Sequence, residues 1–271
     1  MEFCKVIPFD KIEKIACVKS NGKYEALSSV KKRTGADIVI NGPMFDMVSY
    51  SICQSFICNG IERGYTDGKY GFRFDDNTAS LSKGGSGAQH YISEFGMLVM
   101  NGEIKCTVSA SANTRRGRTA IGYTENNELV IYVVTDGEKY ASKKTGKELA
   151  KKMLSLGCRH AINLDGGGSS QVADNTGIYA SGRYVPGFVA VWLKKDENKQ
   201  EDKDKMTVLA TTKVYTYDVK GNKECNRYIA KNDVCTITRT ITENLLIEIE
   251  YPVSSGKRTA YIKTLDGFKV V

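Results

Sequence analysis

An apolar run that ends in one carboxylate and three consecutive glycines is the most informative feature of this chain. Residues 162–170 read Ile-Asn-Leu-Asp-Gly-Gly-Gly-Ser-Ser, so Asp165 directly follows a pattern typical of a buried strand. Glycine loses more backbone entropy on folding than any other residue, so a folded protein keeps three of them where side chains would obstruct something. We expect the amides of Gly166, Gly167 and Gly168 to face a bulky anion, such as a phosphate, beside the Asp165 carboxylate. A flexible hairpin tip is the alternative interpretation.

The overall composition is that of a soluble globular protein. The chain has 271 residues, of which 41% are hydrophobic and 26% charged, and no apolar run reaches the length of a membrane span. The N-terminal Met-Glu-Phe-Cys-Lys lacks a signal-peptide pattern, so we expect a protein that is cytoplasmic as synthesised and that acts at the cell wall only after release. The formal net charge of +8 comes from dispersed Lys and Arg residues, which suits a polyanionic partner but predicts neither a nucleic-acid stripe nor a membrane surface.

A charged run separates a large N-terminal part of the chain from a small C-terminal part. Residues 194–205 read Lys-Lys-Asp-Glu-Asn-Lys-Gln-Glu-Asp-Lys-Asp-Lys, with no apolar residue to bury. We predict a linker there, between one domain at 1–193 and a second domain at 206–271.

The larger domain combines a few helices with many strand patterns. One helix pattern ends at Gly35 before a buried strand, and another begins at a capping box of Thr145 and Glu148 and ends at Gly157. Further strands are expected at 96–100, 118–122, 129–134, around 161–162, and at 188–193. Together these patterns predict an α+β fold with a mixed β-sheet core and a few helices.

The smaller domain reads as all-β. Short strand patterns occur at 208–210, 213–217, 234–240, 245–249 and 258–262, with turn signals between them. Five short strands in a domain of this size predict a small barrel-like fold. Its tyrosines either fill the small core, which we favour, or stack on sugar or peptide; they are Tyr215, Tyr217, Tyr228, Tyr251 and Tyr261.

Four segments of the larger domain share one format, in which a strand delivers a polar residue into a tight turn. Functional sites are usually built on loop ends that a rigid sheet holds in place. The occurrence of four such segments in one domain therefore indicates a functional site. The segments are Asn41-Gly42-Pro43-Met44-Phe45-Asp46, Arg118-Thr119-Ala120-Ile121-Gly122, Thr135-Asp136-Gly137 and Asn163-Leu164-Asp165-Gly166-Gly167-Gly168-Ser169.

Together, these segments resemble the phosphodiester glycosidase family, the family of the animal uncovering enzyme, which removes N-acetylglucosamine from a phosphodiester-linked mannose. The family pattern is Asn-Gly-x-x-Phe, Arg-Thr-Ala-x-Gly, an apolar strand ending in Asp-Gly, and Asn-Leu-Asp-Gly-Gly-Gly-Ser, and all four occur here in that order. One departure is that Pro43 and Met44 precede Phe45, where the family usually has a small residue and then an aromatic one. The C-terminal domain resembles a bacterial SH3-type domain of the sort attached to cell-wall enzymes.

The resemblance implies a hydrolase that releases a sugar such as N-acetylglucosamine from a sugar 1-phosphodiester, with a phosphate-linked glycan as partner. The departing phosphate monoester is a weak base, so the site needs charge stabilisation more than a strong general acid. The expected catalytic residues are Asp165, as base, nucleophile or oxocarbenium stabiliser, Asp136 as second carboxylate, and Arg118 as a planar fork for phosphate. The expected substrate-binding residues are Asn41, Gly42, Phe45, Thr119, Asn163, Gly166, Gly167, Gly168 and Ser169.

Three points stay open at the level of sequence. No cofactor or resident metal is expected, although Asp136 and Asp165 could share a divalent cation. His90 and His160 are interpreted as structural. The alternatives to an enzyme are a non-catalytic phosphosugar- or nucleotide-binding protein, and a structural phage or envelope protein on a decayed enzyme fold.

Overall fold

The computed structural model of the chain divides into two compact units, Met1–Lys194 and Lys195–Val271. The predicted linker therefore lies, except for Lys194, outside the described residues. These residues are 2–107, 114–137, 143–180, 182–194, 206–218, 220–241, 246–254 and 256–271.

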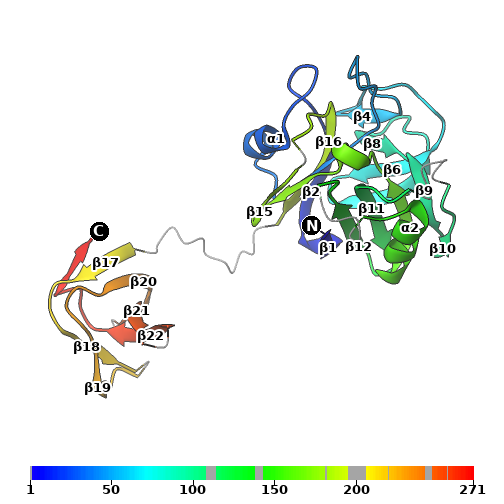
Figure 1. Ribbon diagram of the computed structural model, residues 1–271. Coiled ribbons are helices and arrows are strands. Elements are labelled where there is room, and N and C mark those ends of the chain that lie inside the picture. The colour runs from blue at the N-terminus through cyan, green and yellow to red at the C-terminus, as the bar shows by residue number, and fades with distance from the viewer. Residues whose placement is uncertain are drawn as a thin grey trace. The chain divides into compact units, whose positions relative to one another are not determined.

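A six-stranded antiparallel sheet forms one layer of the first unit. In spatial order its strands are β1 (Glu2–Pro8), β12 (Glu128–Val134), β11 (Arg118–Thr124), β13 (Cys158–Asn163), β9 (Gly96–Met100) and β10 (Glu103–Ile104). Side chains alternate between its two faces, so Ala120 and Ala161 pack against helix α2 (Gly146–Ser155) whereas Ile121 and Ile162 enter the main core. Figure 1 shows α2 against this sheet.

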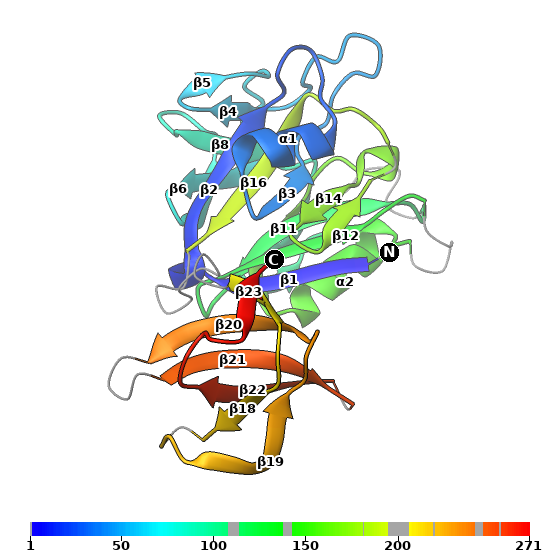
Figure 2. The same ribbon diagram turned by 90° about the vertical axis from the view of Figure 1, so that its left-hand side faces the viewer.

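A five-stranded antiparallel sheet forms the facing layer. Its strands are, in order, β15 (Gly177–Tyr179), β14 (Val172–Asp174), β3 (Ile38–Asn41), β16 (Gly187–Leu193) and β2 (Ile12–Lys19). Helix α1 (Leu27–Thr34) covers its outer face, where Leu27 and Val30 pack on Val39 and Phe188 (Figure 2).

A third sheet completes the first unit. It contains, in order, β5 (Ile61–Glu62), β4 (Phe56–Cys58), β8 (His90–Ser93), β6 (Tyr70–Asp75) and β7 (Thr78–Lys83). Phe56, Phe72 and Ile92 from this sheet join the inner faces of the other two sheets in one hydrophobic core. The first unit is therefore a layered structure with a β core, in which α2 covers the outer face of the six-stranded sheet and α1 that of the five-stranded sheet.

The local sequence signals of the first unit are largely confirmed. Gly35 ends α1 in the left-handed conformation with a φ of 64°, and Thr145 and Glu148 form a complete capping box at the start of α2. The expected mixed sheet is wrong, because every strand pairing described in this unit is antiparallel. The α+β prediction is confirmed in part, because strands predominate and α1 and α2 are the two α-helices of the described residues.

The second unit is a seven-stranded antiparallel sheet. Its strands are, in order, β19 (Lys223–Ile229), β18 (Val214–Tyr217), β22 (Gly256–Ile262), β21 (Leu246–Val253), β20 (Val234–Ile241), β17 (Met206–Ala210) and β23 (Phe268–Val270). Over the described residues its edge strands β19 and β23 do not pair with each other, so the sheet does not close into the expected barrel.

The tyrosines of the second unit correct the sequence-based interpretation. Among the five, Tyr251 belongs to the hydrophobic core, whereas Tyr215 and Tyr228 are 43% and 45% exposed. Thr216 is fully buried, and the alternation along a strand therefore turns its neighbours Tyr215 and Tyr217 outward. The core is built instead from aliphatic side chains of the facing strands.

No helix in the described part of the chain is long and apolar enough to cross a membrane.

Candidate active site

A pocket of about 420 Å³ lies where the loops after the central strands of the first unit meet. Both predicted carboxylates, the three glycines and Phe45 line it. The full lining is Met44, Phe45, Met47, Thr114, Arg115, Arg116, Asp136, Lys143, Asp165, Gly166, Gly167, Gly168 and Arg183.

Asp165 lines this pocket and is only 7% exposed. Main-chain hydrogen bonds fix its position, because Leu164 N donates to Thr119 O and Asp165 N donates to Gly42 O. The carboxylate accepts a 2.7 Å hydrogen bond from Gly166 N and interacts with the Ser169 hydroxyl. Burial raises the pKa of Asp165 to about 6, although these hydrogen bonds and the nearby Arg183 act in the opposite direction.

Asp136 follows β12 and behaves differently from Asp165. Its Oδ1 accepts a 2.8 Å hydrogen bond from Gly117 N and lies 3.5 Å from Lys143 Nζ. Burial acts to raise the pKa of Asp136, but the Gly117 amide and the Lys143 ammonium together hold that pKa below its usual value. The pocket therefore holds two carboxylates whose surroundings push their pKa values apart, a pattern that separates acid–base from purely electrostatic roles.

Gly117 connects the two carboxylate-bearing turns. Its N–H binds Asp136, and its carbonyl oxygen accepts a 2.9 Å hydrogen bond from Gly167 N. A Cβ at this position would lie 2.6 Å from Gly167 O and 2.8 Å from Asp136 N, and these are backbone atoms that cannot move aside. Residue 117 must therefore be glycine for the two turns to come together.

The glycine triplet does not present a row of bare amides, which corrects the sequence-based expectation. Gly166 N donates to the Asp165 carboxylate and Gly167 N to Gly117 O. Gly167 has a φ of +61°, and a Cβ on Gly168 would lie 2.6 Å from the Arg183 guanidinium. The glycines thus allow a tight one-turn 3-10 helix and the close approach of an arginine.

Arg118 does not reach the pocket as expected for a phosphate-binding fork. Its side chain is 1% exposed, and its guanidinium donates to Lys144 O and Thr114 O at 3.0 Å each. The physical reason is strand alternation, because Arg118 shares a face of β11 with Ala120, which packs against α2. Burial, followed by the positive charge of Arg116, lowers the pKa of Arg118 to about 10. Arg118 acts as a buried support behind the pocket wall.

Several predicted substrate-binding residues also lie behind the pocket surface. Asn41, Thr119, Asn163 and Ser169 are each at most 1% exposed, and Gly42 is buried. Asn41 Oδ1 accepts hydrogen bonds from Thr119 Oγ1 and Gln171 N, and Asn163 Nδ2 donates to Leu164 O. These residues hold the loops that carry Asp165, whereas Phe45 and the glycines form the surface that a ligand would touch.

The sequence did not identify Arg183, which lines the pocket from the segment before β16. Its Nη1 donates to Ser169 Oγ at 3.2 Å, and its guanidinium lies over Gly168. Gly182, with a φ of +84°, is the local signal of a turn that presents this arginine, but a Gly-Arg pair carries no specificity in sequence.

Three further cationic side chains line the pocket, those of Arg115, Arg116 and Lys143. Arg115 pairs with Glu148 and donates to Lys143 O, whereas the Nε of Arg116 is buried without a hydrogen-bond partner in the described part of the chain. With Arg183, the described lining thus contains four cationic side chains and two carboxylates. This arrangement suits a ligand that carries negative charge next to a group at which a carboxylate can act.

The lining of the pocket contains neither His90 nor His160. Nδ1 of His90 accepts from Asn59 N, and Nδ1 of His160 from Asn101 N; burial lowers the pKa of each histidine. Over the described residues, no group of three or more His, Cys, Asp or Glu side chains converges as metal ligands would.

With this geometry established, comparison with known proteins defines the class. A model of the phosphodiester glycosidase family matches residues 34–192, which is more than half of the chain. The chain belongs to the phosphodiester glycosidase family, and the matched region contains the pocket.

Individual relatives are more distant. The chain is 37% identical over 79 residues to the SPbeta prophage-derived uncharacterized protein YomE of Bacillus subtilis (strain 168), a match that covers 29% of this chain and 11% of that protein. Among solved structures, a hypothetical protein from Synechocystis is similar with a TM-score of 0.60 and 12% identity, over 71% of this chain and 59% of that one.

The catalytic domain of zebrafish N-acetylglucosamine-1-phosphodiester alpha-N-acetylglucosaminidase, auto-inhibited by its pro-peptide, is also similar. Its TM-score is 0.55 at 16% identity, over 72% of this chain and 83% of that one. At such identities the structural matches establish a shared fold. The chain thus spans about a tenth of the length of YomE and 59% of the Synechocystis protein.

Proposed function

We propose that the first unit is a hydrolase that cleaves the bond between sugar and phosphate in a sugar 1-phosphodiester and releases a sugar such as N-acetylglucosamine. One observation carries this proposal: the buried Asp165 and the partly exposed Asp136 share a pocket whose other described charged side chains are all cationic. Membership of the phosphodiester glycosidase family supports the same reaction class.

The cations account for the leaving group. A phosphate monoester leaves with negative charge that needs stabilisation rather than a proton. Arg183 offers a planar fork of N–H donors held in place by Ser169, and it replaces Arg118 in the role expected from the sequence. The buried Nε–H of Arg116 has no acceptor among the described residues, so it is available to donate a hydrogen bond to a ligand. Together these side chains hold the phosphate while its bond to the sugar breaks.

The two carboxylates account for the attack on the sugar. With a pKa of about 6, Asp165 is ionised in most molecules at neutral pH yet remains a stronger base than an exposed carboxylate. Asp165 takes a proton from water as the water oxygen bonds to the anomeric carbon, and the bond from that carbon to the phosphate oxygen breaks. Asp136, held ionised by Gly117 and Lys143, stabilises the oxocarbenium-like charge that develops.

The test is turnover of a methyl diester of N-acetylglucosamine 1-phosphate in ¹⁸O-labelled water. We expect free sugar together with methyl phosphate that carries no label, because the water oxygen then bonds to the anomeric carbon and not to phosphorus. Label in the phosphate, with release of sugar phosphate, would make the protein a phosphodiesterase instead. Asp165→Asn should abolish turnover, whereas Asp10→Asn, at an exposed site in the same unit, serves as the matched control.

The same variant separates an enzyme from a binding protein. Loss of turnover with retained affinity for methyl phosphate supports the hydrolase. If the wild-type protein binds the diester without turnover and Asp165→Asn weakens that binding, the chain is a phosphosugar-binding protein on the same fold.

For the second unit, we propose an SH3-like module that binds an anionic cell-wall glycopolymer. Support comes from what we term the Tyr–Lys face, in which lysine ammonium groups lie over outward-facing tyrosine rings. Lys223 Nζ lies 3.5 Å from the centroid of Tyr215 and Lys213 Nζ 3.8 Å from that of Tyr228. Lys263 lies 4.6 Å from Tyr217 and completes the face. Rings for sugar stacking beside cations for phosphate match a polymer of sugar phosphates.

Sedimentation of the full-length protein with cell-wall preparations tests this binding. We expect Lys213→Glu with Lys223→Glu to remain in the supernatant, and the charge-matched exposed pair Lys231→Glu with Lys269→Glu to sediment like the wild type. Binding that survives extraction of the phosphate polymer from the walls contradicts the proposal. On this proposal the protein acts at the wall after release from the cell that makes it, and the partial similarity to a prophage-derived protein is consistent with release on lysis.

A further inference from the structure

The exposed face of helix α2 carries lysines that continue the positive charge of the pocket. Lys143 lines the pocket and comes shortly before Thr145, the N-cap of α2. Lys147 and Lys151 are exposed and lie one helical turn apart, about 6 Å along the helix axis. We call Lys143, Lys147 and Lys151 the lysine strip, which begins in the pocket and continues along the outside of the helix.

Hydrogen bonds fix the start of the strip against the pocket wall. Arg116 pairs with Lys144 in an antiparallel bridge, with N–O distances of 3.3 and 3.2 Å. Arg115 Nη1 donates to Lys143 O at 2.8 Å, and Arg118 Nε donates to Lys144 O at 3.0 Å. The segment that enters α2 is therefore held on residues of the pocket, so the pocket and the helix keep one relative position.

The carboxylates around α2 do not neutralise Lys147 and Lys151. Glu148, the one acidic residue of the helix, is already paired with Arg115. Glu2 of β1 pairs with two other lysines, at 3.8 and 3.7 Å. Neither Lys147 nor Lys151 takes part in an ion pair with another residue of the described chain. The strip therefore presents uncompensated positive charge to solvent.

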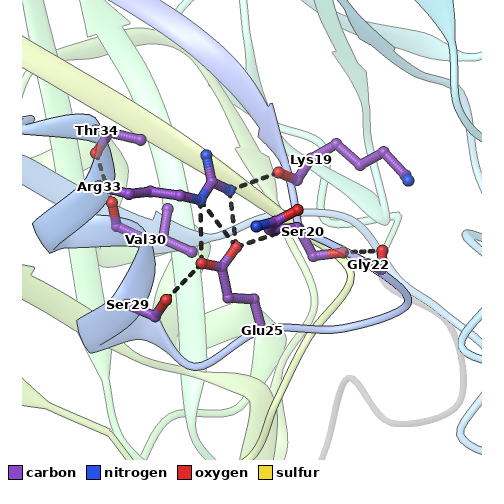
Figure 3. A network of polar contacts seen from close by, with 9 residues as sticks. Lys19, Ser20, Gly22, Glu25, Ser29, Val30, Arg33 and Thr34 are labelled. Atoms are coloured by element: carbon purple, nitrogen blue, oxygen red, sulfur yellow. Dashed lines mark hydrogen bonds and ion pairs between the residues drawn. The ribbon is translucent and has the colours of Figure 1, made fainter.

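Lys147 occupies an unfavourable position for a lysine. It lies in the first turn of α2, where the partial positive charge of a helix N-terminus repels a cation. Helix α1 has the usual arrangement, with its basic side chains in the last turn, and Figure 3 shows Arg33 bound to the Glu25 carboxylate at 2.7 Å. Helix stability therefore does not explain Lys147, whereas attraction of an anion toward the pocket does.

The charge of the surface changes sign at the other end of α2. A cavity of about 460 Å³ lies beside Leu154 of the last turn, and its charged lining consists of Glu125, Glu128 and Arg159. With its ten residues α2 is about 15 Å long, so the cationic pocket and this net acidic cavity bound a short strip. An anionic chain on the strip is attracted at the pocket end and repelled at the far end, which favours placement of its end in the pocket.

We propose that the lysine strip binds a polyanionic chain, a polymer of sugars joined by phosphodiesters, of which one end lies in the pocket. This inference rests on the proposed function for the reaction at that end. Several phosphates in one chain meet several lysines at once, so the polymer gains more attraction than a single phosphate does. A pocket of about 420 Å³ admits the end of a single chain but not a nucleic-acid duplex. The first unit thereby prefers polymeric diesters to short ones.

Binding to the full-length protein tests the strip without depending on turnover. All proteins carry Lys213→Glu with Lys223→Glu, which removes the contribution of the Tyr–Lys face, and calorimetry compares linear inorganic polyphosphate with methyl phosphate. We expect Lys147→Gln with Lys151→Gln to weaken polyphosphate about tenfold and to leave methyl phosphate unchanged within about twofold. Glutamine keeps the length and the helix propensity of lysine, so the helix is retained.

Two further variants control for charge and for position. Lys147→Arg with Lys151→Arg keeps both positive charges and should retain the affinity for polyphosphate. Lys32→Gln with Lys83→Gln removes two charges from exposed positions on α1 and β7, away from α2, and should bind polyphosphate like its parent.

The outcomes separate this inference from the proposed function. Equal affinity for polyphosphate in the strip variant and in the control overturns the inference even if the wild-type protein hydrolyses the methyl diester. The expected pattern in a protein that does not hydrolyse the diester supports the strip and overturns the hydrolase. Duplex DNA that binds more tightly than polyphosphate, and loses affinity in the strip variant, overturns the choice of a single-chain phosphodiester polymer as occupant.

Discussion

The side-chain amide of Asn41 donates a 2.8 Å hydrogen bond to the main-chain carbonyl oxygen of Asp165. The other end of the same side chain accepts from Thr119 Oγ1 at 2.7 Å and from Gln171 N at 3.1 Å. Asn41 ends a strand of the five-stranded sheet and Thr119 lies in the six-stranded sheet, so one amide joins the two layers at the carboxylate of the pocket. Asn41, which the sequence analysis expected to bind substrate, instead holds the main chain of Asp165 in position.

Replacing Asn41 by Ala should therefore reduce both stability and turnover. The change leaves a buried hydroxyl, a buried amide and a buried carbonyl without partners, which costs about 2–4 kcal/mol. Urea unfolding followed by the fluorescence of Trp192, the one tryptophan of the chain and part of the first unit, measures this loss. The exposed Asn126→Ala variant should change stability by less than about 0.5 kcal/mol, and a similar loss in both variants would contradict the assigned role.

A methyl group at residue 168 should affect activity more than stability. In Gly168→Ala the new Cβ would lie 2.6 Å from Arg183 Nη2, and the end of that flexible side chain can move away. We expect turnover to fall at least about tenfold while the urea midpoint changes little, because the displaced guanidinium no longer meets the phosphate. Gly137→Ala is the control, since a Cβ there has no heavy atom within 4 Å. Equal activity in the two variants would argue against Arg183 as the phosphate ligand.

Arg118 and Arg183 should respond oppositely to removal of their side chains. Arg183→Ala should lower kcat/KM for the diester by about 100-fold or more, with a small effect on stability, because the side chain is partly exposed at the pocket. Arg118→Ala should cost about 3–5 kcal/mol of unfolding free energy, because it empties a buried site and leaves Thr114 O and Lys144 O without these donors. Parallel measurement of Trp192 fluorescence in urea and of steady-state turnover gives both quantities, and a stable but inactive Arg118 variant would restore the sequence-based role.

The features that could be predicted from the sequence are those set by interactions between residues close together in the chain. A glycine at φ of 64° ends α1 and a Thr–Glu capping box begins α2, and both depend only on residues within one turn. The carboxylates Asp136 and Asp165 were also predictable as pocket residues, because each follows an apolar strand directly and the ends of neighbouring strands meet.

The roles that could not be predicted from the sequence depend on which face of a sheet a side chain lies on. Arg118 precedes Thr119 in one motif, but alternation sends them to opposite sides of β11, and the packing of α2 decides which side is the pocket. Arg183 enters from a segment with no motif of its own. The outward direction of Tyr215 depends on a register in which Thr216 is buried, and short polar strands specify register weakly.

Asp165 should make the protein less stable as the pH rises. Its pKa is raised from 3.8 to about 6 in the folded state, so the folded protein binds the proton more tightly than the unfolded chain. The resulting stability is fully present below about pH 4 and is lost as the pH rises through about 6, a change of about 3 kcal/mol. Asp165→Asn removes this loss and should be more stable than wild type at pH 7, although inactive. Asp136→Asn should have the opposite sign, because its folded-state pKa is lowered and its ionised form stabilises the fold at neutral pH. Urea unfolding of the three proteins at pH 4, 5, 6 and 7 checks both signs, and a difference between Asp165→Asn and wild type that is the same at every pH would show that Asp165 is not held in a desolvated state.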